Sequence, residues 1–146
     1  MTGLQMLRAM MEQTEPSPGI GTLLGMEVLR LEDGVAEMGL TTRPDFANPL
    51  GTVHGGIAAT LLDSVLGCAV HSTLPAATGY TTLDLAVKYL RTVPTNGVRL
   101  RGVGRVVHRG SRVVTAEGSV LDEQDRLVAT GTATCLVLPA APRPTA

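Results

Sequence analysis

The stretch NPLGTVHGGIAATLLDSVLGC, residues 48–68, joins a polar loop broken by glycines to the most apolar run of the chain. From Gly55 to about Ser72, apolar residues occupy every side of a helical projection, and the run is too long for an ordinary strand. This pattern predicts one long helix that is buried all round. Asp63 lies in its middle, and a buried, unpaired carboxylate costs on the order of several kcal/mol. We therefore expect Asp63 to be paired, to lie at an interface, or to take part in chemistry.

Two shorter elements are predicted before this helix. Leucine and methionine recur at helical spacing in residues 3–13, which indicates a short amphipathic helix within an N-terminal segment of residues 1–14. The prolines and glycines of residues 15–21 then favour a loop. Residues 23–40 form two short strand-like runs around Asp33–Gly34, a dipeptide that is typical of a β-hairpin turn.

After the long helix the apolar period changes to two, and four strands are predicted, over residues 82–90, 98–107, 112–121 and 126–138. In the first of these strands, the side chains expected to share one face are Leu83, Leu85, Val87 and Tyr89. In the last strand, the side chains expected to point inward are Leu127, Ala129, Ala133, Cys135 and Val137. The short turns between these strands favour antiparallel pairing.

Together these elements predict an α+β fold. A single sheet hides an all-round apolar helix only if the sheet curls around it, which is the hotdog fold: an antiparallel sheet wrapped around one long central helix, here with a short N-terminal helix. A chain of 146 residues is most simply one domain, and we assign residues 1–138 to it. The remaining residues, PAAPRPTA at 139–146, are expected to form a disordered tail.

Composition and charge argue against several classes of partner. The formal net charge is −1, and the chain has no Trp, one Phe and two Tyr, so that no nucleic-acid partner is expected. Two cysteines without CxxC spacing indicate neither a disulfide framework nor a thiolate metal site. Arg8 and Glu12 interrupt the first apolar segment, unlike a signal peptide, and no charge-free run approaches the roughly 20 residues of a membrane span. We expect a cytoplasmic protein without a membrane partner or a metal.

Three motifs along the chain resemble those of a known family. N-P-x-G-x-x-H-G-G at residues 48–56 is followed by Asp63, YLR stands at 89–91, and VVHRGSR stands at 106–112. Over residues 15–138 this combination resembles the hotdog-fold acyl-CoA thioesterases, nearest to the PaaI type of phenylacetate degradation and related to the 4-hydroxybenzoyl-CoA thioesterases. The resemblance implies hydrolysis of a small or aryl acyl-CoA to the free acid and CoA. It also implies a homodimer, commonly paired into a homotetramer, and no separate cofactor, since CoA is part of the substrate.

Helix geometry separates the two most distinctive polar residues. His54 and Asp63 are nine residues apart, so at 100° per residue they point to opposite sides of a helix, with a rise of about 13 Å between them. One helix therefore does not bring both into the same site, and if both are catalytic they act in different copies of the site. The resemblance implies the same arrangement, because the family's active sites lie at the subunit interface with the acid supplied by the partner chain.

The glycine after His54 is a candidate for binding the thioester carbonyl oxygen. Gly55 lies at the predicted helix N-terminus, where backbone N–H groups lack partners within the helix and the helix dipole favours negative charge. Such an amide would stabilise the oxyanion that develops during acyl transfer, and the resemblance implies this role for Gly55. Asp63 would then act on water, either as a general base or as the carboxylate that attacks the thioester, and the sequence leaves both routes open.

Three further residues are candidates for the site. Asn48 fits as a donor to the carbonyl or the water, and His54 fits near the thioester sulfur or the leaving thiolate, but either residue alone could serve only as a turn or helix cap. The resemblance implies a hydroxyl early in the strand after the helix, which matches Thr82 if one residue is inserted in GYTTLD, with Thr81 as the alternative. One helical turn after Asp63, the 4-hydroxybenzoyl-CoA branch carries a hydroxyl where this chain has Gly67, a departure that favours the PaaI type.

Coenzyme A requires cationic groups and free amides for its phosphates. The positions that the resemblance favours for this contact are Leu90, Arg91, His108, Arg109, Gly110, Ser111 and Arg112. The alternative for the turn at 108–112 is a solvated hairpin end.

Two other functions compete with thioester hydrolysis. Hotdog hydratases and dehydratases carry D-x-N-P-x-H, whereas DFANPLGTVH at residues 45–54 places the histidine five residues after the proline instead of two. A non-catalytic acyl-CoA binding protein is the other alternative.

Overall fold

The structure is a computed structural model that describes residues 1–140. Its elements are α1 (Gly3–Met11), α2 (Ile20–Leu24), β1 (Glu27–Glu32), β2 (Val35–Thr41), the 3-10 helix η1 (Pro44–Phe46), α3 (Gly55–Ser72), β3 (Gly79–Tyr89), β4 (Arg99–Arg109), β5 (Val113–Leu121) and β6 (Leu127–Leu138). The predicted disordered tail falls mostly on residues 141–146, which lie outside the described part, so that prediction stays untested.

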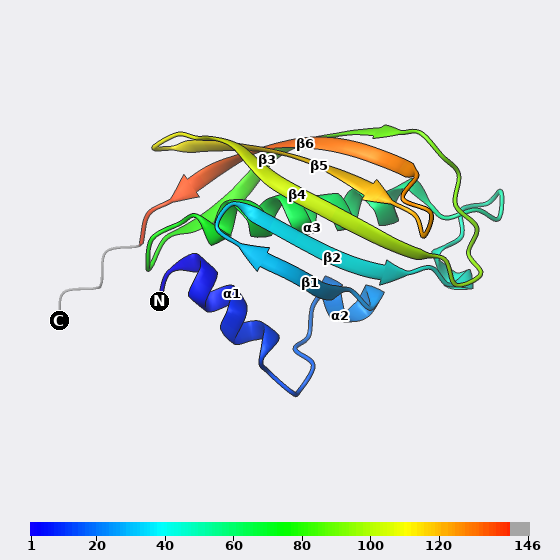
Figure 1. Ribbon diagram of the computed structural model, residues 1–146, viewed down its shortest axis with the longest axis horizontal. Coiled ribbons are helices and arrows are strands. Elements are labelled where there is room, and N and C mark those ends of the chain that lie inside the picture. The colour runs from blue at the N-terminus through cyan, green and yellow to red at the C-terminus, as the bar shows by residue number, and fades with distance from the viewer. Residues whose placement is uncertain (141–146) are drawn as a thin grey trace.

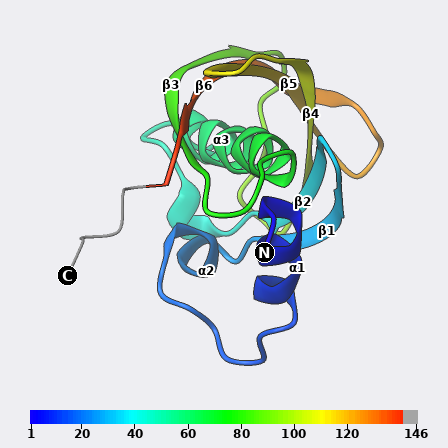
Figure 2. The same ribbon diagram turned by 90° about the vertical axis from the view of Figure 1, so that its left-hand side faces the viewer.

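The six strands form one antiparallel sheet in the order β1-β2-β4-β5-β6-β3. The sheet curls over α3 (Figure 2), and α1 lies below the hairpin of β1 and β2 at one end of the molecule (Figure 1). An antiparallel sheet wrapped around one long helix, with a short helix at the N-terminus, is the predicted α+β hotdog fold. The prediction of the fold class is therefore confirmed.

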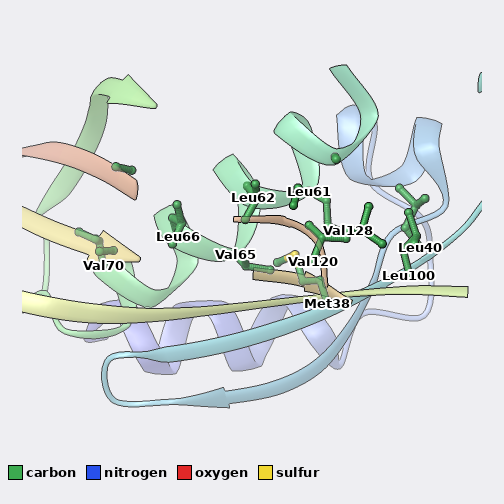
Figure 3. Packing of buried hydrophobic residues seen from close by; sticks show 14 of the residues in the cluster. Met38, Leu40, Leu61, Leu62, Val65, Leu66, Val70, Leu100, Val120 and Val128 are labelled. Atoms are coloured by element: carbon green, nitrogen blue, oxygen red, sulfur yellow. The ribbon is translucent and has the colours of Figure 1, made fainter. Parts of the chain in front are cut away.

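The core forms where α3 packs against the concave face of the sheet (Figure 3). Leu61, Leu62, Val65, Leu66 and Val70 of α3 have no exposed surface. Glycine in β4 permits this close approach: a Cβ at position 104 would lie 2.7 Å from the Val65 carbonyl oxygen. By length and mean hydropathy α3 is apolar enough to span a membrane, but its packing inside the sheet accounts for that composition.

The structure corrects four details of the predicted elements. β3 begins at Gly79, and a β-bulge between Thr82 and Asp84 interrupts the alternation, so Leu83 is 56% exposed rather than on the inner face. In β6, Leu127 is 44% exposed while Val128 is buried, since the pairing with β5 also shifts register there. Helix α2 occupies residues predicted as the end of a loop and the start of a strand.

Edge strand β3 runs beside α3 in the opposite direction. Tyr89 reaches Gly55 at the start of the helix, Thr82 reaches Asp63 in its middle, and Tyr80 reaches Gly67 one turn further on. We call this line of contacts the α3–β3 seam. Within residues 1–140 its outer side is open, because β3 has only β6 as a neighbour in the sheet.

Candidate active site

The loop before α3 is held by its own side chains. The Asn48 Oδ1 accepts hydrogen bonds from the backbone N–H groups of Leu50 (3.0 Å) and Thr52 (3.2 Å), and its Nδ2 donates to the Thr52 hydroxyl at 2.9 Å. Asn48 therefore closes the turn, and one hydrogen of its amide remains for another partner.

His54 is the N-cap of α3. Its Nδ1 accepts a hydrogen bond from the Gly56 N–H at 2.9 Å, which requires an unprotonated Nδ1 and leaves Nε2 as the outward-facing nitrogen of an exposed side chain. The capping role that the sequence offered as an alternative for His54 is thus present in the structure.

Gly55 offers the backbone donor of this loop. Within residues 1–140 nothing accepts a hydrogen bond from its N–H, while its carbonyl accepts one from the Tyr89 hydroxyl at 2.7 Å. A Cβ at this position would lie 3.1 Å from the Tyr89 ring, so glycine leaves room for that contact. Asn48, His54, Gly55 and Tyr89 are called the amide half-site below.

The amide half-site lines a cleft of about 350 Å³. Leu90 and Arg91, two of the predicted CoA contacts, line the same cleft. An unpaired amide at a helix N-terminus carries partial positive charge, so the cleft is suited to an oxygen that becomes negative.

Helix α3 is not buried all round as predicted, because one of its faces lies along the open seam: Asp63, in its middle, is exposed. Its Oδ1 accepts a hydrogen bond from the Thr82 hydroxyl at 3.0 Å. The bulge after Thr82 turns this side chain toward α3, whereas Thr81 is exposed, so Thr82 rather than the alternative Thr81 contacts the acid. Asp63 and Thr82 are called the acid half-site.

One chain does not bring the two half-sites together. Neither Asp63 nor Thr82 lines the cleft of the amide half-site, and the eight residues from Gly55 to Asp63 correspond to a rise of about 12 Å along α3. The open seam leaves both half-sites on the same side of the molecule.

The predicted CoA residues at 108–112 differ in what they can offer. Residues 109–112 line a second cleft, of about 620 Å³, beside the C-terminal end of α3. The Arg109 guanidinium is 2.8 Å from an Asp33 carboxylate oxygen, and the Gly110 N–H donates to the Val113 carbonyl at 2.9 Å, so both are engaged. Arg112 is exposed and forms no ion pair with a described residue, and His108 lines neither of these two clefts.

Sequence reasoning missed the two tyrosines of the seam as site residues. Tyr80 and Tyr89 are the only tyrosines of the chain, and each lies against a glycine of α3. Side chains two positions apart in a strand point to the same face of the sheet. Because Thr82 was expected to face the site, Tyr80 could have been predicted to face it as well. Cys68, on the same helix, is unsuited to nucleophilic chemistry because burial and then the nearby Asp63 raise its pKa to about 11.

Comparison with known proteins gives one family. The model of the thioesterase superfamily matches residues 50–129. A Halobacterium salinarum protein is 39% identical over 112 residues, spanning 73% of this chain and 72% of its own. The medium/long-chain acyl-CoA thioesterase YigI of Escherichia coli is 30% identical over 129 residues, spanning 78% of this chain and 82% of its own.

A solved structure agrees with this result. The crystal structure of a phenylacetic acid degradation-related protein of Ralstonia eutropha superposes with a TM-score of 0.80 at 32% identity, covering 88% of this chain and 97% of that one. The resemblance to PaaI-type hotdog thioesterases, first drawn from the motifs, is confirmed.

Proposed function

The chain belongs to the thioesterase superfamily and is a thioester hydrolase, and from that premise we propose that it hydrolyses a small or aryl acyl-CoA at a site shared by two copies of the chain. The observation that carries this proposal is the seam, which presents an amide half-site and an acid half-site on one open edge. Neither half-site alone contains both a free amide and a carboxylate.

The exposed edge of β3 is complementary to a second copy of itself. An antiparallel pair with its two-fold axis at Ala86 places Val87 opposite Leu85 of the partner subunit, and Lys88 opposite Asp84 of the partner subunit. Asp84 and Lys88 are exposed and form no ion pair with a described residue. Two such charge pairs favour this register over its neighbours.

The same register joins the two half-sites. Leu83 is the extra residue of the bulge and does not count as a paired position. Counted from Ala86, the paired positions are 85, 84 and 82 toward the N-terminus, and 87, 88 and 89 toward the C-terminus. Thr82 and Tyr89 are therefore each three positions from Ala86. Thr82 therefore meets Tyr89 of the partner subunit. Because Thr82 bonds Asp63 and Tyr89 bonds Gly55, the carboxylate of one chain faces the free amide of the other.

In this shared site the thioester carbonyl oxygen accepts a hydrogen bond from the Gly55 N–H, which stabilises the developing oxyanion. Asp63 of the other chain acts on water as a general base, or attacks the carbonyl carbon itself. Thr82 holds the carboxylate. The His54 Nε2 lies toward the sulfur, and the remaining Asn48 amide hydrogen lies toward the carbonyl or the water.

Coenzyme A would bind across both chains. Arg91 lines the cleft of the amide half-site, and Arg112 lines the cleft beside the C-terminal end of α3. The phosphates of CoA would be held by these two cations, with Leu90 against the pantetheine arm and with contributions from Ser111 and His108. Pairing of such dimers into a tetramer and a cytoplasmic location stay predictions from the sequence.

A panel of acyl-CoAs with a thiol reagent tests the reaction. Aryl and short acyl-CoAs should release free thiol fastest, and a preference for medium or long chains, as in the name of the E. coli relative, would correct the substrate class. Hydration of a 2-enoyl-CoA without thiol release would favour the hydratase alternative. Tight binding without any turnover, unaffected by Asp63→Asn, would favour a binding protein.

Subunit mixing tests the sharing. Asp63→Asn chains and His54→Ala chains, each inactive alone, should regain about a quarter of the wild-type activity after subunit exchange, because half of the dimers are mixed and each mixed dimer has one intact site. No recovery in a mixture shown to have exchanged would contradict a shared site. Asp84→Lys should weaken the dimer and Asp84→Lys/Lys88→Asp should restore it, which tests the register.

A further inference from the structure

One helical turn after Asp63 lies Gly67, and the space beside it is filled by a side chain of strand β3. Gly67 is buried and its backbone conformation is one that any residue adopts, so the backbone does not require glycine, which is a poor helix former. A Cβ there would clash with the Tyr80 hydroxyl oxygen and lie 3.0 Å from the ring atoms Cε2 and Cζ. The absence of a side chain at Gly67 thus leaves the space that the Tyr80 phenol occupies.

The Tyr80 hydroxyl has no hydrogen-bond partner within residues 1–140, and it is not sealed from solvent. A largely buried phenol usually finds a partner, and a hydroxyl that reaches solvent can take a water molecule as that partner. The ring is held in place by Gly67 on one side and by the His71 ring, whose centroid is 5.5 Å away, on another. Burial, and after it the charges of Cys68, Cys135 and Asp63, raise the pKa of Tyr80, so the hydroxyl keeps its proton.

The hydroxyl occupies the place of a side chain at i+4 from Asp63. Side chains at this spacing lie on one helix face about 6 Å apart, a gap that a single water molecule can bridge with hydrogen bonds to both. Thr82 already holds the other side of the carboxylate. The two seam hydroxyls therefore flank the space in front of Asp63.

We propose that Tyr80 is a positioning residue that, together with Asp63, holds the water which attacks the thioester, and that Asp63 therefore acts as a general base. This inference rests on the proposed function. The water donates one hydrogen to the Asp63 carboxylate and the other to the Tyr80 oxygen, which directs a lone pair to the carbonyl carbon. The water oxygen bonds to that carbon, Asp63 takes the proton, the carbon–sulfur bond breaks, and the leaving thiolate receives the proton from Asp63. Tyr80 neither gains nor loses a proton.

Tyr80→Phe tests the role of the hydroxyl, because it removes that group and leaves the ring packed against Gly67. We expect kcat for thiol release to fall about 10- to 100-fold, with KM and the thermal unfolding midpoint unchanged, because water rather than substrate loses its support. A matched pair of double variants tests the location: Gly67→Ser/Tyr80→Ala returns a hydroxyl from the helix, and Gly67→Ala/Tyr80→Ala does not. The serine variant should have the higher kcat.

The outcomes separate this inference from the proposed function. If the wild-type protein releases no thiol from any acyl-CoA, both fail. If it does, and Tyr80→Phe has the wild-type kcat or changes KM alone, only the role of Tyr80 is overturned. Equal kcat values in the two double variants would likewise overturn the placement of the hydroxyl beside Asp63.

Discussion

The two half-sites of the α3–β3 seam share one helix and one strand, but one offers a backbone group and the other offers a side chain. In the amide half-site the side chains are engaged within the protein: Asn48 closes a turn, His54 caps α3, and Tyr89 bonds the Gly55 carbonyl. The group left open is a backbone N–H. In the acid half-site the backbone is paired within a helix and a strand, and the open group is the Asp63 side chain.

This difference predicts how each half-site responds to substitution. The position of a backbone donor depends on the loop and the helix cap around it. Substitutions in the loop or the cap therefore alter the geometry of the site and the start of the helix together. A carboxylate on a rigid helix can lose its chemistry while the fold is unaffected. Function and stability should therefore separate in the acid half-site and stay coupled in the amide half-site.

Asp63→Asn should give the largest loss of activity. We expect thiol release from acyl-CoA to fall about 1000-fold or more, because the amide does not accept a proton from water at neutral pH. The fold should be unaffected, since Asp63 is exposed and the asparagine carbonyl can still accept the Thr82 hydrogen bond. Steady-state kinetics and thermal unfolding measure the two quantities. Asp125→Asn, in an exposed turn, is the control, and wild-type turnover by Asp63→Asn would disprove the assignment.

Gly55→Ala should give a smaller loss that comes from geometry. The added methyl group would lie 3.1 Å from the Tyr89 ring, so the ring must shift from the Gly55 carbonyl, and the amide shifts with it. We expect kcat to fall about 10- to 100-fold and KM to change less. Gly21→Ala in α2, where a Cβ meets no atom of the described residues within 4 Å, is the matched control. Equal kinetics for the two variants would argue against the amide as the oxyanion donor.

The sequence predicted the parts of this comparison that depend on periodicity. The apolar run specified α3 and the curled sheet. Helix geometry predicted the rise between His54 and Asp63, but it placed them on opposite sides of the helix, whereas both half-sites lie along β3, because His54 is the N-cap and does not follow the helical projection. The bulge at Leu83 was hidden, because alternation is counted from residue to residue and one extra residue moves every later side chain to the other face. Thr82 was found only because the family resemblance required an insertion near it.

The contacts that depend on packing across elements could not be predicted. Nothing in the sequence around Gly67 says which side chain fills its empty space, since Tyr80 comes from a strand thirteen residues away along the chain. In the same way, the motif at 108–112 suggested five equivalent contacts, whereas Asp33 engages Arg109 and leaves Arg112 open. Long-range partners of this kind are set by the fold rather than by local spacing.

Arg112→Ala should give an effect on binding that neither half-site shares. If Arg112 contacts a CoA phosphate, KM should rise about tenfold with kcat unchanged, and the difference should shrink at high salt. Arg105→Ala is the control, because Arg105 is exposed and pairs with Glu117 on the sheet. A fall in kcat without a change in KM would place Arg112 outside the CoA site.

The smallest expected effect concerns pH and the far end of the seam, where His71 packs against the Tyr80 ring. Burial lowers the pKa of His71, although a cation in the last turn of a helix is favoured by the dipole. The unfolded chain takes up this proton once the pH falls below about 6.5, and the folded protein only at a lower pH, so His71 lowers the free energy of unfolding as the pH falls through this window. The unfolding midpoint of His71→Gln should therefore drop less between pH 7 and pH 5 than that of the wild type, with His108→Gln as the control for loss of an imidazole. Equal drops in His71→Gln and wild type would show that His71 contributes no such linkage.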